Sequence, residues 1–236
     1  MGRVLAIGDT HCPAMHNRYP DFLYDIAQCW GVDKFVHIGD GVDNRAISFH
    51  AKEVGIHSIE EEIALADKQI AQLVSAIGTD LDYMIGNHSA LPSRQASVVG
   101  LSKRHIAPMT SVYESWPATW RIHDRYEDLV IDGVIYRHGD KGLSNAYNAA
   151  YRNAEKECQS LVQGHLHAQA GVIWGANSHT AYFGAQTGCG TDPRSDYLNY
   201  AKIYSKRPVL GCVVVLDGEY PYFEWMDLDK YKRNEE

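Results

Sequence analysis

The sequence predicts an α/β (α+β) fold in which two β-sheets form a sandwich flanked by helices. As far as His167, short apolar runs alternate with amphipathic stretches, a pattern that is typical of parallel βα units. Beyond that residue, apolar runs are separated mainly by turn residues, which indicates a β-rich part of the chain. A two-sheet sandwich accommodates this order better than a single doubly wound sheet does.

The strands are predicted from short apolar runs bounded by Gly, Asp, Asn or His. Asp132-Gly133 lies at the centre of one stretch and predicts a tight hairpin. We expect strands over 4–8, 35–39 and 81–85, a hairpin over 129–137, and further strands over 161–164, 171–174, 180–185, 209–216 and 220–225.

Helices are predicted where apolar residues recur with a helical period. The longest such stretch begins at Ser58, and Glu61 three residues later completes the pattern of a capping box. Gly31 is expected to end the first helix. The predicted helices cover 21–30, 58–77, 93–105 and 143–161. Because no linker or repeat interrupts the chain, residues 1–236 are interpreted as one domain, with its motifs in 9–167 and a β-rich part over 168–228.

The composition is that of a globular protein, with 45% hydrophobic and 22% charged residues. No apolar run is long enough to span a membrane, and the N-terminus does not resemble a signal peptide, so we expect a cytoplasmic protein with no membrane partner. The five cysteines are widely spaced, which argues against a disulfide framework or a thiolate zinc site. A net charge of −8 argues against a broad face for duplex DNA.

Metal-ligand side chains directly follow five of the predicted strands. In layered α/β proteins the carboxyl ends of parallel strands gather at one edge, where ligands bind. Three Asp, five His and one Asn at such ends therefore predict one polynuclear metal site. The five segments are Asp9-Thr10-His11, Gly39-Asp40-Gly41-Val42-Asp43, Gly86-Asn87-His88, His138-Gly139 and Gly164-His165-Leu166-His167.

The residue types indicate which ions this site would bind. His and carboxylate ligands without thiolate suit Mn²⁺, Fe or Zn²⁺. These side chains are more numerous than one tetrahedral ion requires, so we expect two ions that share a ligand. Asp40 is the natural shared ligand, since a carboxylate can give one oxygen to each metal. Such a pair would hold a bridging hydroxide and suits the hydrolysis of a phosphate ester.

In this order the five segments resemble the motifs of the calcineurin-like metallophosphoesterases. The resemblance implies that family's αββα architecture and a cofactor of two divalent metal ions, Mn²⁺ first, with Fe or Zn²⁺ as alternatives. It assigns one ion to Asp9, His11 and His167, and the other to Asn87, His138 and His165, with Asp40 between them. The compact chain looks similar to small single-domain members from bacteria and bacteriophages. For a protein encoded by a bacteriophage, the expected location would be the cytoplasm of the host cell.

The resemblance also implies roles for two residues that are not metal ligands. His88 would protonate the leaving oxygen or stabilise the transition state, and Asp43 would orient a ligand or the loop around it. One departure concerns Ser89, because the family usually has Asp or Glu directly after this histidine. That change leaves the pKa and rotamer of His88 open, and Asp140 is a candidate replacement.

Several basic and aromatic residues are candidates for substrate binding. Arg45 and Arg94 lie just beyond metal motifs and could each hold a phosphate oxygen, although an exposed ion-paired arginine is the commoner case. The stretch 192–207 interleaves basic residues with tyrosines, which hints at a nucleotide or single-stranded nucleic acid, although a polar surface segment is the simpler interpretation. His37 is expected to be a hydrogen-bonded core residue, and His50 and His57 are weaker candidates near substrate.

The sequence thus predicts a phosphoesterase that hydrolyses a phosphate ester, with a phosphodiester of a nucleotide or nucleic acid as the favoured substrate. Two alternatives stay open. The protein could be a non-catalytic scaffold that keeps the metals, which only Ser89 favours, or it could be a phosphomonoesterase or protein phosphatase. The oligomeric state cannot be predicted from these patterns.

Overall fold

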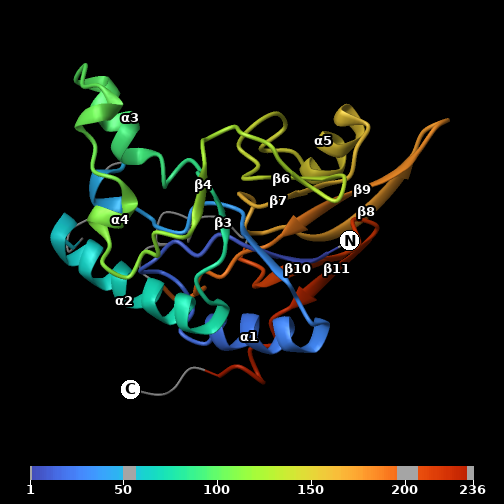
Figure 1. Cartoon of the computed structure of the whole chain (residues 1–236), viewed down its shortest axis with the longest axis horizontal. Coiled ribbons are helices and arrows are strands. Elements are labelled where there is room, and N and C mark those ends of the chain that lie inside the picture. Colours follow the sequence, from blue (N-terminus) through green and yellow to red (C-terminus); the bar gives the residue numbers. More distant parts are fainter. Residues whose placement is uncertain (1, 50–56, 196–206, 233–236) are drawn as a thin grey trace.

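A computed structural model describes residues 2–49, 57–195 and 207–232. Its two β-sheets lie face to face, and helices cover both outer faces (Figure 1). The six-stranded sheet contains, in spatial order, β11 (Tyr220–Trp225), β10 (Gly211–Leu216), β1 (Arg3–Ile7), β2 (Lys34–His37), β3 (Asp82–Met84) and β4 (Arg121–His123). The five-stranded sheet contains β5 (Leu129–Ile131), β6 (Val134–Arg137), β7 (Leu161–Gln163), β9 (Ala181–Thr187) and β8 (Ala170–Ala176). The predicted two-sheet fold is therefore confirmed.

The middle of each sheet is parallel, and the outer strands include antiparallel ones. In the first sheet β1, β2, β3 and β4 run in the same direction, and β10 runs against β1. In the second sheet β6, β7 and β9 run in the same direction, with β5 and β8 antiparallel at the edges. The strands that precede the five polar segments are thus parallel within each sheet, and their carboxyl ends share an edge.

The main core lies between the two sheets. Successive side chains of a strand point to opposite faces, and β1 shows this alternation clearly. Val4 and Ala6 join the core between the sheets, whereas Leu5 and Ile7 belong to the core under the helices. Burial on both faces explains why this strand is an uninterrupted apolar run.

Two helices cover the outer face of the six-stranded sheet and one covers the other sheet. Helix α1 (Tyr19–Trp30) ends at the left-handed Gly31, with a φ of 61°, and α2 (Ile59–Ile77) begins with the predicted capping box of Ser58 and Glu61. On the five-stranded sheet lies α5 (Ala149–Glu157). None of the helices in the described ranges is long and apolar enough to cross a membrane.

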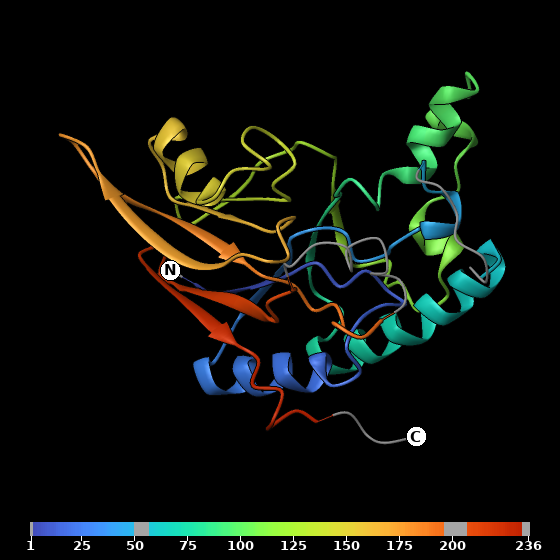
Figure 2. The ribbon, with the colours of Figure 1, turned by 180° about the vertical axis from the view of Figure 1, so that it is seen from behind.

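A group of short elements stands away from the sheets at one end of the molecule (Figure 2). They are η1 (Arg45–Ile47), α3 (Leu91–Val98), η2 (Lys103–His105) and α4 (Met109–Val112). The predicted helix over 93–105 is therefore wrong in its extent, because α3 ends at Val98 and η2 is a separate turn. The prediction also missed β4 and α4, which are too short to carry a clear period.

The helix predicted over 143–161 is also shorter than expected. Only Ala149–Glu157 is helical, and the left-handed Asn148, with a φ of 61°, precedes it. The side chain of Asn153 explains part of the difference, because it pairs with both the N–H and the carbonyl of Leu143 and holds that residue in a loop. Such a tertiary contact has no signature in the local sequence.

Candidate metal centre

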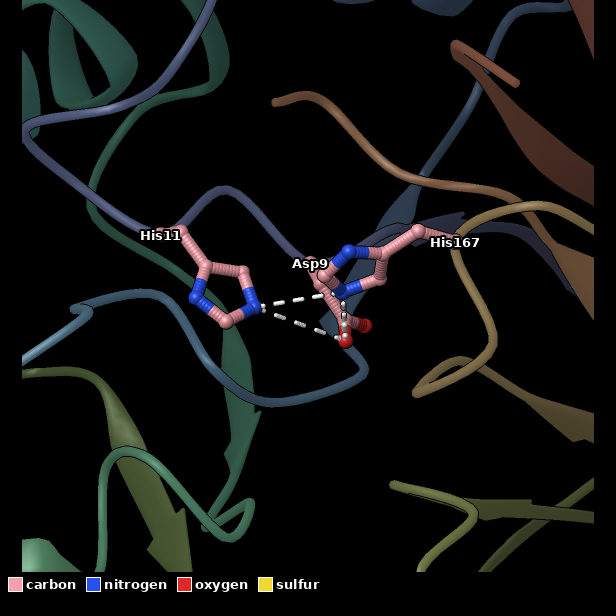
Figure 3. A group of neighbouring side chains, drawn as sticks. All are labelled: Asp9, His11 and His167. Atoms are coloured by element: carbon pink, nitrogen blue, oxygen red, sulfur yellow. Dashed lines mark hydrogen bonds and ion pairs between the residues drawn. The ribbon is translucent and has the colours of Figure 1, made fainter. Parts of the chain in front are cut away.

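The first group of candidate ligands joins the end of β1 to the segment after β7. Asp9 is fully buried, and its Oδ2 lies 3.1 Å from Nε2 of His167 (Figure 3). Nε2 of His11 lies 3.2 Å from Nε2 of His167 and 3.9 Å from Oδ2 of Asp9. One donor atom from each of the three residues thus lies within 4.8 Å of the others. Residues more than 150 positions apart are brought to one point, as the sequence predicted.

The second group joins the ends of β2, β3, β6 and β7. Oδ2 of Asp40 lies 3.1 Å from Nε2 of His138, and Oδ1 of Asn87 lies 3.0 Å from the same nitrogen. The ring centroids of His138 and His165 are 5.1 Å apart, and Asp40, His138 and His165 again have donor atoms within 4.8 Å of one another. The two groups adjoin, because the N–H of His165 lies 3.1 Å from Oδ2 of Asp9.

Unusual backbone conformations aim several of these side chains inward. His11, Asp40 and His165 have φ values of 47°, 47° and 69°, in the left-handed region that L-residues avoid. Such conformations are costly and tend to persist where function requires them. Gly86 allows close approach, because a Cβ there would overlap Oδ1 of Asp40 and lie 2.7 Å from Cε1 of His138.

The donor set could hold divalent metal ions. Nδ1 of His138 lies 3.2 Å from the carbonyl of Ile38 and Nδ1 of His11 lies 2.6 Å from Oδ1 of Asp43, so the neutral form of each ring would donate from Nδ1 and leave the lone pair of Nε2 for a cation. The Nε2 atoms of His11 and His167 then face one another, a contact that a cation between them would satisfy. Carboxylate, imidazole and amide oxygen are donors for Mn²⁺, Fe or Zn²⁺.

The charged groups of the cluster shift one another's pKa values. Burial alone would raise the pKa of Asp9 and Asp40, but His138 and neighbouring imidazoles outweigh it and hold both carboxyls ionised. Burial lowers the pKa of His138, yet Asp40 and Asp9 together raise it to about 9. For His165, burial and the adjacent His138 lower the pKa to about 4. The carboxylates of the cluster are therefore ionised, the form in which a carboxylate binds a metal ion.

His88 lies at the edge of the centre and is paired with Asp43. Its Nδ1 is 3.0 Å from Oδ1 of Asp43 and 2.9 Å from the carbonyl oxygen of the same residue. Burial lowers the pKa of His88, but the hydrogen bond to Asp43 and the charge of Asp40 outweigh it and raise the pKa to about 10. The side chain of His88 is 22% exposed, so part of the ring remains accessible to a bound molecule.

The Ser89 departure has a structural explanation. Ser89 is buried and its Oγ lies 2.7 Å from the hydroxyl of Tyr83, so this position points into the protein. Asp43 partners His88 instead. The suggested replacement, Asp140, does not take this place, because its carboxylate binds Arg125 at 2.7 Å.

The backbone N–H groups of His88 and Ser89 determine how Asp40 can act. They donate to its Oδ1 over 2.8 and 3.1 Å. These bonds fix the carboxylate so that Oδ2 lies against Nε2 of His138, at 3.1 Å.

The candidate substrate-binding residues lie in several different parts of the structure. Arg94 borders the centre, with Nη1 3.4 Å from the carbonyl oxygen of Asn87 and its guanidinium over the ring of Phe49. Arg45 begins η1, and its N–H donates to Glu62 over 2.7 Å. His57 is an exposed neighbour of Glu61, 3.8 Å away. His37 is buried and lies 3.1 Å from Oγ1 of Thr10, as predicted for a core histidine. His50 and residues 196–206 lie outside the described residues.

The sequence analysis missed a chain of buried amides behind His165. Nδ2 of Asn153 donates to Oε1 of Gln163 over 2.9 Å, and Nε2 of Gln163 donates to Oε1 of Gln186 over 3.3 Å. Gln186 in turn donates to the carbonyl of Gly164, the residue before His165. A glutamine at the end of an otherwise apolar strand was the available signal, because a buried polar side chain needs partners.

Comparisons with known proteins place the chain in a family. It is similar to the solved structure of a single mutant of Vps29 from Entamoeba histolytica, with 13% identity over 94% of this chain and 92% of that chain and a TM-score of 0.42. For vacuolar protein sorting 29 from Cryptosporidium parvum the identity is 13% over 95% of this chain and 97% of that chain, with a TM-score of 0.46. For YfcE, a phosphoesterase from E. coli, the identity is 11% over 91% of this chain and 88% of that chain, with a TM-score of 0.43. No curated protein matches the sequence. The family model for calcineurin-like phosphoesterases matches residues 2–188 of the 236. The chain therefore belongs to the calcineurin-like phosphoesterase family.

Proposed function

We propose that this protein is a metal-dependent phosphoesterase, and that its substrate is a phosphodiester, with nucleotides and single-stranded nucleic acid as candidates. One observation carries the proposal. Two adjoining groups of His, Asp and Asn donors converge beside His88, an accessible imidazole that its surroundings keep protonated. Family membership supports a hydrolase of phosphate esters.

The donor positions suggest how two ions would be held. Asp9, His11 and His167 would bind one ion, and Asn87, His138 and His165 the other, with Asp40 between them. Mn²⁺ is the ion we favour, and Fe or Zn²⁺ suits the same donors. When bound, the ions would supply Lewis acidity toward the phosphoryl oxygens and an activated water as nucleophile.

The residues around the ions would perform the remaining steps. His88 would donate its Nε2 proton to the leaving oxygen, and Asp43 would orient the ring through Nδ1. Arg94, beside the carbonyl of Asn87, and Arg45, at the start of η1, are proposed to hold a non-bridging phosphate oxygen. These residues would thus act together in one displacement.

The proposal is tested with a panel of aryl phosphates, linear and cyclic nucleotides and nucleic acid in the presence of Mn²⁺. We expect hydrolysis of an aryl phosphodiester, and its loss in Asp40→Asn and His138→Ala. His88→Ala should keep its metal but lose about 10²–10⁴-fold in kcat, the usual contribution of a general acid. Undiminished activity of Asp40→Asn and His138→Ala, from clean protein, would contradict the assignment.

A non-catalytic, metal-binding scaffold is the second candidate, and Ser89 is the observation that favours it. The pairing of Asp43 with His88 weighs against this candidate, because it supplies the carboxylate that Ser89 lacks. Bound metal with no turnover across monoesters and diesters would favour the scaffold. A nuclease would instead show salt-sensitive binding of single-stranded DNA, weakened by Lys206→Ala and Arg207→Ala.

A further inference from the structure

A cavity adjoins the loops that carry Asp43 and His88. Its volume is about 570 Å³, within the range of sites for small molecules. Asn44, Ser89 and Ala90 form part of its wall, and Nδ2 of Asn44 donates to the carbonyl of His88 over 3.1 Å. The cavity and the candidate metal centre therefore border the same short loops.

The remaining walls of the cavity are mostly aliphatic. Helix α2, helix α4 and the turn before α4 contribute side chains such as Ile63, Met109 and Ile106. Two lining side chains are large, apolar and yet 38% and 45% exposed, namely Ile59 and Ile122. Apolar side chains that stay accessible inside a concave site are typical of a ligand pocket.

Charged groups also border the cavity. Lys103 and His105 of η2 line it, together with Asp124, which lies 4.0 Å from the ammonium group of Lys103. These side chains are exposed, so they sit where the cavity meets solvent. Basic groups there favour the approach of a negatively charged molecule.

We propose that this cavity binds the apolar alkyl or aryl group of a small phosphate ester whose phosphoryl group lies at the metal centre. The inference rests on the proposed function and narrows its substrate class. Asn44 and Ser89, which line the cavity, directly follow Asp43 and His88 in the sequence, and we therefore place the organic group of an ester held beside His88 in this cavity. A nucleobase fits these walls less well, because aliphatic side chains would leave its donors and acceptors without partners.

The first experiment measures binding of phosphonates, which cannot be hydrolysed and carry a single organic group. Methyl-, hexyl- and phenylphosphonate and thymidine 5′-monophosphate are titrated into the Mn²⁺-loaded protein by calorimetry. We expect Kd values at least about tenfold lower for the hexyl and phenyl compounds than for the methyl compound, because each buried methylene strengthens binding. Equal affinity across the series, or tightest binding of thymidine monophosphate, would overturn the inference.

A matched pair of variants locates the effect. Ala107 is exposed and lines the cavity, so Ala107→Trp fills the space and should abolish the preference for hexylphosphonate. Ala118 is equally exposed but lies outside the cavity lining, so Ala118→Trp should keep the preference. The same preference in both variants would place the apolar group elsewhere and overturn the proposal.

A second readout does not depend on metal or turnover. 1-Anilinonaphthalene-8-sulfonate, an apolar anion, should bind the metal-free protein saturably, with affinity about tenfold weaker in Ala107→Trp and unchanged in Ala118→Trp. Equal binding to both variants would contradict the assignment.

Aryl diester hydrolysis without any discrimination among the phosphonates would overturn the inference and leave the proposed function standing. Discrimination without hydrolysis of any ester would leave the pocket standing and overturn the proposed function.

Discussion

At the scale of single residues, two buried glutamine side chains support the backbone next to His165, a candidate metal ligand. Gln186 donates to the carbonyl of Gly164 and accepts from Gln163, and both glutamine side chains are buried. Gly164 precedes His165, whose left-handed φ of 69° requires support from its neighbours. Gln186 is therefore a positioning residue for His165.

Replacing this amide by a side chain of similar shape tests its role. In Gln186→Met we expect a loss of about 1–3 kcal/mol in unfolding free energy, because a buried donor and acceptor lose their partner. We also expect Mn²⁺ affinity to fall about 10-fold or more, as is usual when support behind a ligand is removed. Urea denaturation and calorimetric titration measure the two effects.

Gln159 offers the control for this substitution. It also donates from Nε2 to a glycine carbonyl, that of Gly133, over 2.8 Å, but it does so at the surface. Gln159→Met should leave Mn²⁺ affinity unchanged and cost less than about 0.5 kcal/mol of stability. An equal loss of metal affinity in both variants would mean that the hydrogen bond from Gln186 to Gly164 does not position His165.

Ser89 supports a second prediction at this scale. Introducing the family's usual acid, as in Ser89→Asp, would bury a carboxylate against Tyr83 and destabilise the protein by about 2 kcal/mol or more. Ser89→Ala removes one hydrogen bond and should cost only about 1 kcal/mol. Thermal denaturation and kcat are the measurements. A stable Ser89→Asp protein with raised kcat would show that Asp43 does not substitute for the missing acid.

At the scale of elements, a polar pair fastens the edge strand β4 to β3. The guanidinium of Arg121 in β4 contacts both oxygens of Asp82 in β3 at 2.9 Å, and Nε2 of His123 lies 2.8 Å from Oδ1 of Asp82. Burial raises the pKa of Asp82, but the hydrogen bonds from Arg121 and His123 outweigh it, so its pKa is lower than usual. A short edge strand with few apolar contacts needs such a link.

The contribution of the Arg121–Asp82 pair to the stability of the protein depends on pH. A carboxyl whose folded-state pKa is lowered stabilises the protein above its unfolded pKa, near 3.8, and loses that contribution as the pH falls through the folded value. Asp82→Asn should therefore cost about 1–2 kcal/mol at pH 7 and converge with the wild type as the pH falls below the lowered folded-state pKa of Asp82. Denaturant unfolding across this pH range is the measurement.

Asp80 provides the comparison for Asp82. It contacts the same guanidinium at 2.5 Å but is 82% exposed, so solvent screens the interaction. Asp80→Asn should change stability by less than about 0.5 kcal/mol at any pH. A pH-independent cost for Asp82→Asn would mean that packing, not charge, holds β4.

The elements also show what local sequence can reveal. The strands before the five polar segments were predicted because buried runs such as 4–8 are continuous and end in polar residues. Capped helices were found for the same local reason. The limits of α5 were missed because they depend on the contact of Asn153 with Leu143, and β4 was missed because the β3 pairing that defines it is not local.

At the scale of the whole molecule, the candidate centre ties the two sheets together. Asp9, Asp40 and Asn87 come from the six-stranded sheet, whereas His138 and His165 come from the five-stranded one. The sheets also share one buried core. We therefore propose that the chain is one domain that unfolds in a single transition.

Metal should stabilise that single unit. At an ion concentration 100 times Kd, Mn²⁺ is expected to add about 2.7 kcal/mol and raise Tm by about 5–10 °C. In His138→Ala the rise should be much smaller, because one sheet loses a ligand. Calorimetry provides the measurement, and two separate transitions, or an equal rise in both proteins, would contradict the proposal.

The whole-molecule view explains which parts of the site were predictable. The ligand types and their convergence follow from motifs at strand ends, which parallel sheets bring together. The pairing of Asp43 with His88, residues 45 positions apart, depends on how two loops fold against one another. The cavity beside them is formed by separate helices and strands, so no single segment encodes it.

The most direct test of the central claim is the number of Mn²⁺ ions bound per chain. Equilibrium dialysis of the wild type and of Asp40→Asn, followed by elemental analysis, measures it. We predict about two ions for the wild type and no more than one for Asp40→Asn, since this carboxylate is proposed to contact both. A wild type that binds no ion, or an Asp40→Asn protein that still binds two with equal affinity, would contradict a shared dinuclear centre.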